Sequence, residues 1–305
     1  MSGEAFIRLE KSGGGYADCG RIISAVFSKD LYSPYSQLRG SVMLESRIGF
    51  SDIRRVAFYV GGKRVHYGLP DLLRTRVCGG RVIMNVVSRG ITLLLGQNEP
   101  EPGIWSQVSL TEIMDRYSPL SEIGFESGTK TVNYVNINER STLWEALGVY
   151  GVKAYGHRAY IGGDSLVRVT FEDAVAALGG KVIIDYGNQL DTSLMLSKLY
   201  MKNVNGEYGY SYEDDRVQPF GIVREKYYNL DRQWLNDVTA GLKDRVDFAD
   251  REYLTDYLTY VGYGGEDVGD IISAVGYGCN GGRICRLEIT ADNAGVRTKV
   301  SAEAV

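Results

Sequence analysis

Short apolar segments that end at paired glycines constrain the fold of this chain more than any other feature. Residues 59–65 and 77–87 each surround such a pair, Gly61-Gly62 and Gly79-Gly80. Glycine lacks a Cβ and therefore accepts the positive φ angles that a two-residue hairpin turn requires. Asn205-Gly206, between the segments 199–204 and 207–212, carries the same signature. The pattern predicts a chain built mainly from antiparallel β-hairpins.

The distribution of these segments predicts three successive regions. Residues 1–117 are predicted to form a first antiparallel β domain, closed as a small barrel or sandwich that hides its edges. Residues 118–180 combine a strand at 133–138, a helix, and two strands at 158–162 and 166–170 around Gly163-Asp164, which predicts a small α+β module. Residues 181–305 return to strands, with one helix expected at 248–260, and predict a second β domain.

Two capping boxes mark helix starts. Ser109 is followed three residues later by Glu112, and Thr142 by Glu145. In a capping box the first side chain accepts a bond from the third backbone N–H, and the carboxylate accepts one from the backbone N–H of the cap residue. The second helix is predicted to end at Gly156, because glycine ends helices in a left-handed conformation.

The segment 88–110 links the first β domain to the module. Three leucines at 93–95 precede Pro100 and Pro102, and Trp105 follows. Each proline fixes its own φ and removes a backbone donor, so the loop is predicted to be stiff and non-helical. Tryptophan is enriched in binding hot spots. Pro100, Pro102 and Trp105 are therefore candidate residues of a domain or subunit junction, with a core position for Trp105 as the alternative.

A tyrosine stripe is the second candidate interface. Tyrosine favours strands, and its ring combines an apolar body with a polar tip. Tyr208, Tyr210 and Tyr212 alternate along the segment 207–212, which predicts that they share one face of a strand. This stripe could face a neighbouring subunit or a lumen. An ordinary half-solvated sheet face is the alternative that the sequence leaves open.

Composition and charge argue against several classes of protein. No apolar run approaches the roughly 18 residues of a membrane-spanning helix, and residues 1–15 lack the apolar core of a signal peptide. The net charge of −4 argues against a general nucleic-acid-binding protein. Residues 1–117 carry 15 Lys and Arg against 11 Asp and Glu, whereas the remainder carries 19 against 27. Such an asymmetry can reflect different partners at the two ends, or chance.

The ionisable residues form no catalytic or metal-binding pattern. His66 and His157 are far apart in the sequence and are expected in turns or on the surface. The acidic residues of 266–270 lack the alternating oxygen ligands of a calcium loop, and a solvated turn or helix start is expected there. The acidic run 213–215 is expected at a solvated strand end. We predict no catalytic, cofactor-binding or metal-binding residues, and the chain is not expected to be an enzyme.

The four cysteines include no CxxC pair. They are Cys19, Cys78, Cys279 and Cys285. Cys279 and Cys285 flank a glycine-rich turn at 280–282 and could face each other across a hairpin, so a disulfide or metal site remains an alternative. Disulfides are uncommon in proteins without a secretion signal. Free buried thiols are therefore expected.

Several segments of the chain resemble baseplate hub proteins of contractile phage tails and of phage tail-like bacteriocins. In the N-terminal part they are SKDLYSPYSQLRG at 28–40, VAFYVGGKRVHYGLPD at 56–71 and, above all, SRGITLLLGQNEPEPGIW at 88–105. Residues 141–169 resemble the small α+β module of these hubs, and residues 224–234 and 260–272 resemble their C-terminal part. The family is distantly related to late control protein D and to the base of type VI spikes.

The resemblance implies a mainly β fold with an α+β insertion. Two tube-like antiparallel β-barrel domains, residues 1–117 and 181–305, would flank the module at 118–180. It further implies a homotrimer without cofactors, a ring that adapts the six-fold tail tube to the three-fold spike. The implied partners are the central spike protein, the tail tube protein, the tape measure protein and the baseplate wedge proteins. Neither a membrane anchor nor specific nucleic-acid binding is implied, although the lumen could pass DNA. The implied location is the baseplate of the virion tail, after synthesis in the host cytoplasm.

Two other function classes remain open at this point. A tail-tube or tube-terminating ring subunit would form six-membered rings and usually needs only one β domain. A carbohydrate-binding β module is compatible with the abundance of tyrosine.

Overall fold

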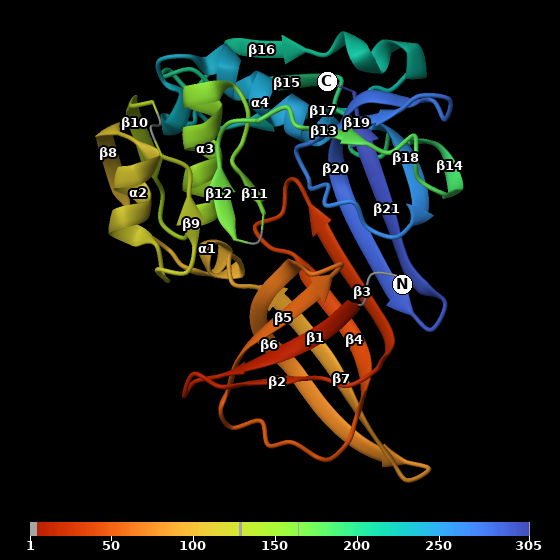
Figure 1. The fold of residues 1–305 in the computed structure, drawn as a ribbon. Helices are drawn as coiled ribbons and strands as arrows, with labels where there is room; N and C mark the ends of the chain where they lie inside the picture. Colours follow the sequence, from red (N-terminus) through yellow and green to blue (C-terminus); the bar gives the residue numbers. More distant parts are fainter. Residues whose placement is uncertain (1–4, 128–129, 164, 305) are drawn as a thin grey trace.

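The computed structural model describes residues 5–127, 130–163 and 165–304. Residues 1–4, which begin the segment without a signal-peptide core, and Asp164, in the expected turn, lie outside the described residues. Figure 1 shows one β-rich region in red and orange, a second in blue, and a yellow-green region beside them that contains the helices α1, α2 and α3.

The first β-rich region consists of antiparallel hairpins. Its strands are β1 (Ala5–Lys11), β2 (Tyr16–Asp18), β3 (Ile22–Asp30), β4 (Gln37–Leu44), β5 (Ile53–Val60), β6 (Lys63–Cys78) and β7 (Arg81–Gly90). Gly61 and Gly62 turn β5 into β6 with φ of 57° and 79°, and Gly79 and Gly80 turn β6 into β7 with φ of 56° and 74°. These positive angles confirm both predicted Gly-Gly turns, because side chains with a Cβ disfavour them.

The α+β module follows. It contains α1 (Leu93–Gln97), β8 (Gly103–Val108), α2 (Leu110–Tyr117), β9 (Gly124–Phe125), β10 (Val132–Ile137), α3 (Leu143–Tyr155), β11 (Tyr160–Gly162) and β12 (Leu166–Arg168). Both predicted capping boxes are present, Ser109 with Glu112 on α2 and Thr142 with Glu145 on α3. Gly156 ends α3 with φ of 83°, as predicted.

The C-terminal region returns to strands and adds one long helix. Its elements are β13 (Val175–Ala177), β14 (Ile183–Leu190), β15 (Lys198–Met201), β16 (Tyr210–Glu213), η1 (Asp215–Phe220), β17 (Glu225–Tyr228), η2 (Arg232–Trp234), α4 (Val238–Asp250), β18 (Leu254–Val261), β19 (Ile271–Ala274), β20 (Cys279–Asp292) and β21 (Gly295–Glu303).

The helix predicted at 248–260 is wrong. Helix α4 begins ten residues earlier, where the Asp237 side chain accepts a bond from the Ala240 backbone N–H, and it ends at Asp250. Residues 254–261 form strand β18 instead, between β14 and β21. Leu258 and Tyr260 of β18 are both buried, so this segment has the two-residue period of a strand that packs one face on the core.

Most strands belong to one sheet that runs through both β-rich regions and is antiparallel except for the parallel pair β13 and β19. Within the described residues its order is β14-β18-β21-β20-β3-β4-β7-β6-β5-β1-β2, with β19 paired to β20 and β13 to β19. The N-terminal and C-terminal regions meet where residues 24–30 of β3 pair with residues 286–292 of β20. In Figure 1 the blue β20 accordingly lies beside the red β3.

Two stretches of this sheet share one topology. We call β3, β4, β6 and β7 the first unit, and β14, β18, β20 and β21 the second unit. In each unit the strands lie in the order first, second, fourth, third: β3-β4-β7-β6 and β14-β18-β21-β20. In each, a further strand precedes the third strand in the chain and pairs with it, β5 with β6 and β19 with β20. The sequence shows no repeat at these positions, so the duplication is visible only in the strand order.

Three apolar cores hold the described residues together. The largest lies against the main sheet and draws on both units. A second lies inside the module and includes Ile91, Leu95, Leu110 and Leu147. A third lies between α4 and the three-stranded sheet β16-β15-β17. The fold is thus mainly β with a small α+β module, as predicted. Because residues from Ile91 onward pack into the second core, the packing favours a junction near residue 90. The division into three domains at 117 and 180 remains a proposal.

Candidate functional site

The predicted junction residues lie at one side of the module. Pro100 is buried and Pro102 is exposed in the loop before β8. Trp105 lies on β8 opposite Val135 of β10. Its half-buried ring stacks on Tyr117 of α2, with centroids 4.5 Å apart and planes 11° apart. The stack fixes Trp105 to its own module and leaves part of the ring open to a shallow groove between β8 and α2. A contact from these residues to another domain or subunit stays a prediction.

The tyrosine stripe is arranged differently from the prediction. Tyr210 and Tyr212 lie on β16, but Tyr208 lies in the loop before it. The predicted two-residue turn at Asn205-Gly206 would need a positive φ at both residues for its type I′ form, but Gly206 alone has a positive φ in this loop, so that turn does not form. The reason is Asn203, whose side-chain oxygen accepts bonds from the backbone N–H groups of residues 205 and 207. This local bonding holds the backbone in a wider loop and shortens both strands.

A different aromatic cluster forms on the same small sheet. The Tyr200 ring stacks on Tyr227 of β17 at 4.6 Å, and Tyr208 meets Tyr227 edge-on at 5.1 Å. Tyr212 instead packs against the third core. Three separate segments contribute the cluster, so no sequence spacing could have identified it. The interface roles of Tyr208, Tyr210 and Tyr212 stay predictions.

The expectation that His66 lies in a turn or on the surface is wrong. This residue of β6 is fully buried. Its Nδ1 lies 2.8 Å from the Ser36 hydroxyl and its Nε2 lies 2.8 Å from the Ser88 hydroxyl. Burial lowers the pKa of His66 to about 3, so the ring is neutral and bonds to both serines. A Cβ at Gly68 would lie 2.5 Å from Nε2. The arrangement is a closed structural contact that leaves no room for a ligand.

His157 also has a packing role. Its half-buried ring stacks on Phe171 at 4.2 Å, and its Nδ1 lies 3.0 Å from the Arg158 carbonyl oxygen. Burial lowers the pKa of His157.

The acidic turn at 266–270 is not solvated, contrary to expectation. Glu266 is buried and accepts a bond from the Tyr260 hydroxyl. Asp267 accepts bonds of 2.7 Å from the ammonium group of Lys29, a buried residue of β3. The same ammonium donates to the Gly163 carbonyl oxygen at 2.7 Å. Through Lys29, this turn of the C-terminal region is therefore bonded to the first unit and to the module. A buried charge needs such a partner, which a sequence run alone cannot reveal.

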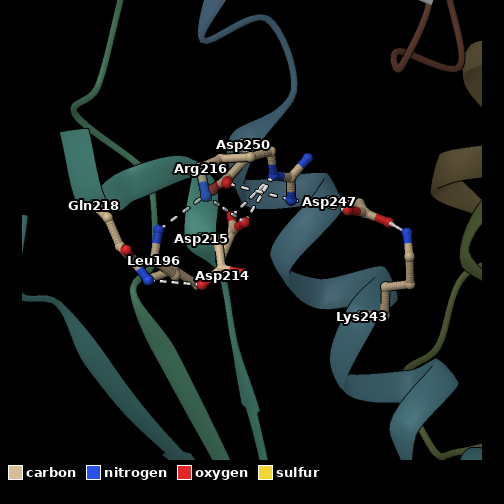
Figure 2. A network of polar contacts seen from close by, with 8 residues as sticks. All are labelled: Leu196, Asp214, Asp215, Arg216, Gln218, Lys243, Asp247 and Asp250. Atoms are coloured by element: carbon tan, nitrogen blue, oxygen red, sulfur yellow. Dashed lines mark hydrogen bonds and ion pairs between the residues drawn. The ribbon is translucent and has the colours of Figure 1, made fainter. Parts of the chain in front are cut away.

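The acidic run 213–215 is likewise not a simple solvated strand end. Figure 2 shows Asp214 beside Arg216, whose guanidinium also faces α4. Asp214 is buried and lies 2.9 Å from Arg216 Nε, while Arg216 Nη2 lies 2.9 Å from Asp247 and 3.4 Å from Asp250. Burial and the neighbouring Asp214 raise the pKa of Asp250 to about 7. The network fastens α4 to η1, and Lys243 pairs with Asp247 at its outer end.

The cysteines are free thiols in the described residues. Cys19, Cys279 and Cys285 are buried, whereas Cys78 is exposed at the end of β6. Cys279 and Cys285 follow each other along β20 and so do not face each other across a hairpin. Among residues 5–127, 130–163 and 165–304, no three metal-ligating side chains converge. None of the helices described is long and apolar enough to span a membrane.

Besides the short strands β2 and β13, two long strands of the main sheet have an edge with no strand beside it in the described chain. Strand β14 pairs only with β18. Strand β6 pairs with β5 as far as Gly68, and its residues 72–78 pair with β7 alone. Large apolar side chains are exposed on both edges, with Ile184, Tyr186 and Leu190 on β14 and Leu72 and Val77 on β6 each more than half accessible. Long exposed edges of this kind are typical of strands that pair with another chain.

Comparison with known proteins finds solved structures with a similar fold and no match by sequence. No family profile and no curated protein matches the sequence. The solved tail protein from Neisseria meningitidis aligns with a TM-score of 0.74 and 13% identity, over 99% of this chain and 96% of that one. The 43 kDa tail protein of prophage MuSo2 from Shewanella oneidensis aligns with a TM-score of 0.72 and 14% identity, over 99% and 97%.

A third solved structure extends the likeness beyond phages. A component of the Escherichia coli type VI secretion system, itself structurally similar to bacteriophage tail proteins, aligns with a TM-score of 0.58 and 8% identity, over 93% of this chain and 74% of that one. At sequence identities this low, the three alignments show a shared fold and nothing more specific. The chain has the fold that phage tail proteins share with this type VI secretion component, in agreement with the resemblance to baseplate hubs.

Proposed function

We propose that the chain is the structural baseplate hub of a contractile phage tail or tail-like particle. In this role it forms a trimeric ring that adapts the six-fold tail tube to the three-fold spike. The observation that carries the proposal is the duplicated unit. Since each chain holds two units with one strand order, three chains supply six similar units around a three-fold axis. Such a ring can meet six-fold symmetry on one side and three-fold symmetry on the other.

The ionisable groups support a structural role. His66, Lys29 with Asp267, and Asp214 with Arg216 are each bonded inside the protein, and all of them except the exposed Arg216 are buried or half-buried. Groups held in this way stabilise contacts between elements and are poorly placed to reach a substrate. The partners that fit this role are the central spike, the tail tube, the tape measure and the baseplate wedge proteins. The location that fits is the virion tail baseplate.

The mass and symmetry of the assembled protein test this proposal. We expect native mass spectrometry to give the mass of three chains, and averaged electron micrographs to show rings with three-fold symmetry and six similar lobes. A ring of six chains would instead favour a tail-tube or tube-terminating subunit. A chain that stays monomeric at high concentration, alone and with its spike, would contradict the proposal.

A further inference from the structure

The joint between the two units supplies a template for a contact between copies. Within the chain, the third strand of the second unit, β20, pairs antiparallel with the first strand of the first unit, β3. Seven residues on each side take part, 286–292 and 24–30. In the eight-strand run that the two units form, the end strands are a third strand, β6, and a first strand, β14, and beyond the start of β6 the sheet continues through β5, β1 and β2. The two strand types that pair inside the chain, a third strand and a first strand, are thus the same two types that have a free edge at the ends of this run.

The free part of β6 corresponds to the paired part of β20. Both strands run into a two-residue hairpin turn, β6 after Cys78 and β20 after Asp292. Counted back from these turns, residues 72–78 of β6 match residues 286–292 of β20. The preceding part of each strand is covered in the same way, by β5 on β6 and by β19 on β20. The seven residues of β6 that pair on one side only, with β7, are therefore the seven whose counterparts in β20 pair with β3.

Strand direction allows the same joint between copies. Each neighbouring pair in the run β14-β18-β21-β20-β3-β4-β7-β6 is antiparallel. Because the run has an even number of strands, its two end strands point in opposite directions. A copy added by rotation about an axis along the strands would therefore present β14 antiparallel to β6. Such a head-to-tail contact closes into a ring if the rotation closes.

The free edges carry the same signs of charge as the strands of the internal joint: positive on the third strand and negative on the first strand. In the internal joint, Arg286 of the third strand faces Asp30 of the first strand, with Nε and Oδ2 3.2 Å apart. On the free edges, Arg74 and Arg76 lie on β6, a third strand, and Asp185 lies on β14, a first strand. Within the described residues none of these three side chains forms an ion pair. Opposite charges that face each other across strands stabilise pairing.

We propose that residues 72–78 of β6 in one copy pair antiparallel with β14 of the next copy. This inference rests on the proposed ring function and names the surface that builds the ring. The contact removes both exposed edges, covers Leu72 and Val77 together with Tyr186 and its apolar neighbours, and brings the free arginines toward Asp185. Repeated around the axis, it turns the separate sheets of the copies into one closed sheet.

The native thiol of Cys78 tests both the contact and its direction. The internal joint pairs Asp292 with Ser24, near the start of β3, so Cys78 should lie near the start of β14. We would prepare Asp185→Cys and, as a matched control, Gln189→Cys, which lies on the same face near the far end of β14. Neighbouring strands are about 4.8 Å apart, within disulfide reach, whereas four residues along a strand add about 13 Å.

Mild oxidation with diamide should link subunits of Asp185→Cys into bands of two and three chains on a non-reducing gel. We expect a yield about ten-fold above that of Gln189→Cys, and no bands when Cys78→Ser is added. Both altered positions are exposed, so circular dichroism should match that of the parent. Equal or reversed yields, or no bands, from a protein with the mass of three chains would overturn this contact and leave the ring itself standing. A monomeric protein would overturn both.

Discussion

The first and second units share a strand order but differ in what their loops carry. Between its first two strands the first unit has a short connection, residues 31–36, whereas the second has residues 191–253. That long connection holds the three-stranded sheet and α4. The free-energy cost of closing a loop grows slowly with its length, so insertions at this place are tolerated. The comparison indicates that the two units share their strand pairing and that they differ in the segments inserted between the strands.

The units also differ in the polar groups that they bury. The first unit holds His66, neutral between two serines. The helix inserted into the second unit carries Asp250, which shares its site with Asp214 and Arg216. A buried neutral base and a buried acid respond to pH in opposite directions. The two regions can therefore be told apart by how their stability depends on pH.

Breaking the joint between the units should have the largest effect. Phe27 of β3 is buried opposite Ile289 of β20. We expect Phe27→Ala to lower the free energy of unfolding by about 3–5 kcal/mol, because it leaves a cavity where the units meet. Urea unfolding followed by fluorescence measures this. The control is Val26→Ala on the opposite, more exposed face, which should change stability by about 0.5 kcal/mol or less. Equal effects would mean that the joint is not a core contact.

Protonation of His66 should give the next largest effect. Its pKa in the folded protein, about 3, lies below the ordinary value of about 6.5. The stability that it contributes is therefore complete above pH 6.5 and is lost as the pH falls toward 3. Between pH 7.5 and pH 5 we expect a loss of about 2 kcal/mol from this group. Urea unfolding of the parent and of His66→Gln at both pH values should show a smaller loss in the variant.

Asp250 should give the opposite dependence, with a smaller size. Its pKa of about 7 in the folded protein is raised, so its contribution to stability is present at low pH and is lost as the pH rises from about 4 to 7. At pH 8 the charged form is disfavoured in the fold, and we expect Asp250→Asn to stabilise the protein by about 1–2 kcal/mol. At pH 4 the gain should vanish. Thermal unfolding at both pH values would measure it, and destabilisation at pH 8 would show that the ion pair with Arg216 outweighs burial.

The parts of the fold that were predicted correctly depend on neighbours in the chain. Gly61-Gly62 and Gly79-Gly80 form turns because glycine accepts positive φ regardless of tertiary context. The capping boxes at Ser109 and Thr142 form because both partners lie within one turn of helix. Each of these signals is complete within four residues.

The parts that were predicted wrongly depend on distant partners. Residues 254–261 become a strand because β14 and β21 lie on either side. His66 becomes neutral and buried because Ser36 and Ser88 arrive from other strands. The duplicated unit, which carries the proposed function, is a property of strand order and has no counterpart in residue spacing. These features depend on contacts between distant strands, so they can be predicted only once the pairing of the sheet is known.

The proline loop should give the smallest effect, and it tests whether the region beside the units is stiff. Pro100 is buried and Pro102 is exposed. Replacing a proline by alanine adds freedom to the unfolded chain, worth about 0.4–1 kcal/mol. We expect Pro100→Ala with Pro102→Ala to change unfolding by no more than that and yet to weaken ring association, measured as a shift in the sedimentation midpoint. Pro102→Ala alone is the matched control, because this residue packs less. If the double variant assembles like the parent, the loop has no role in keeping the ring rigid, and strand pairing alone would have to do so.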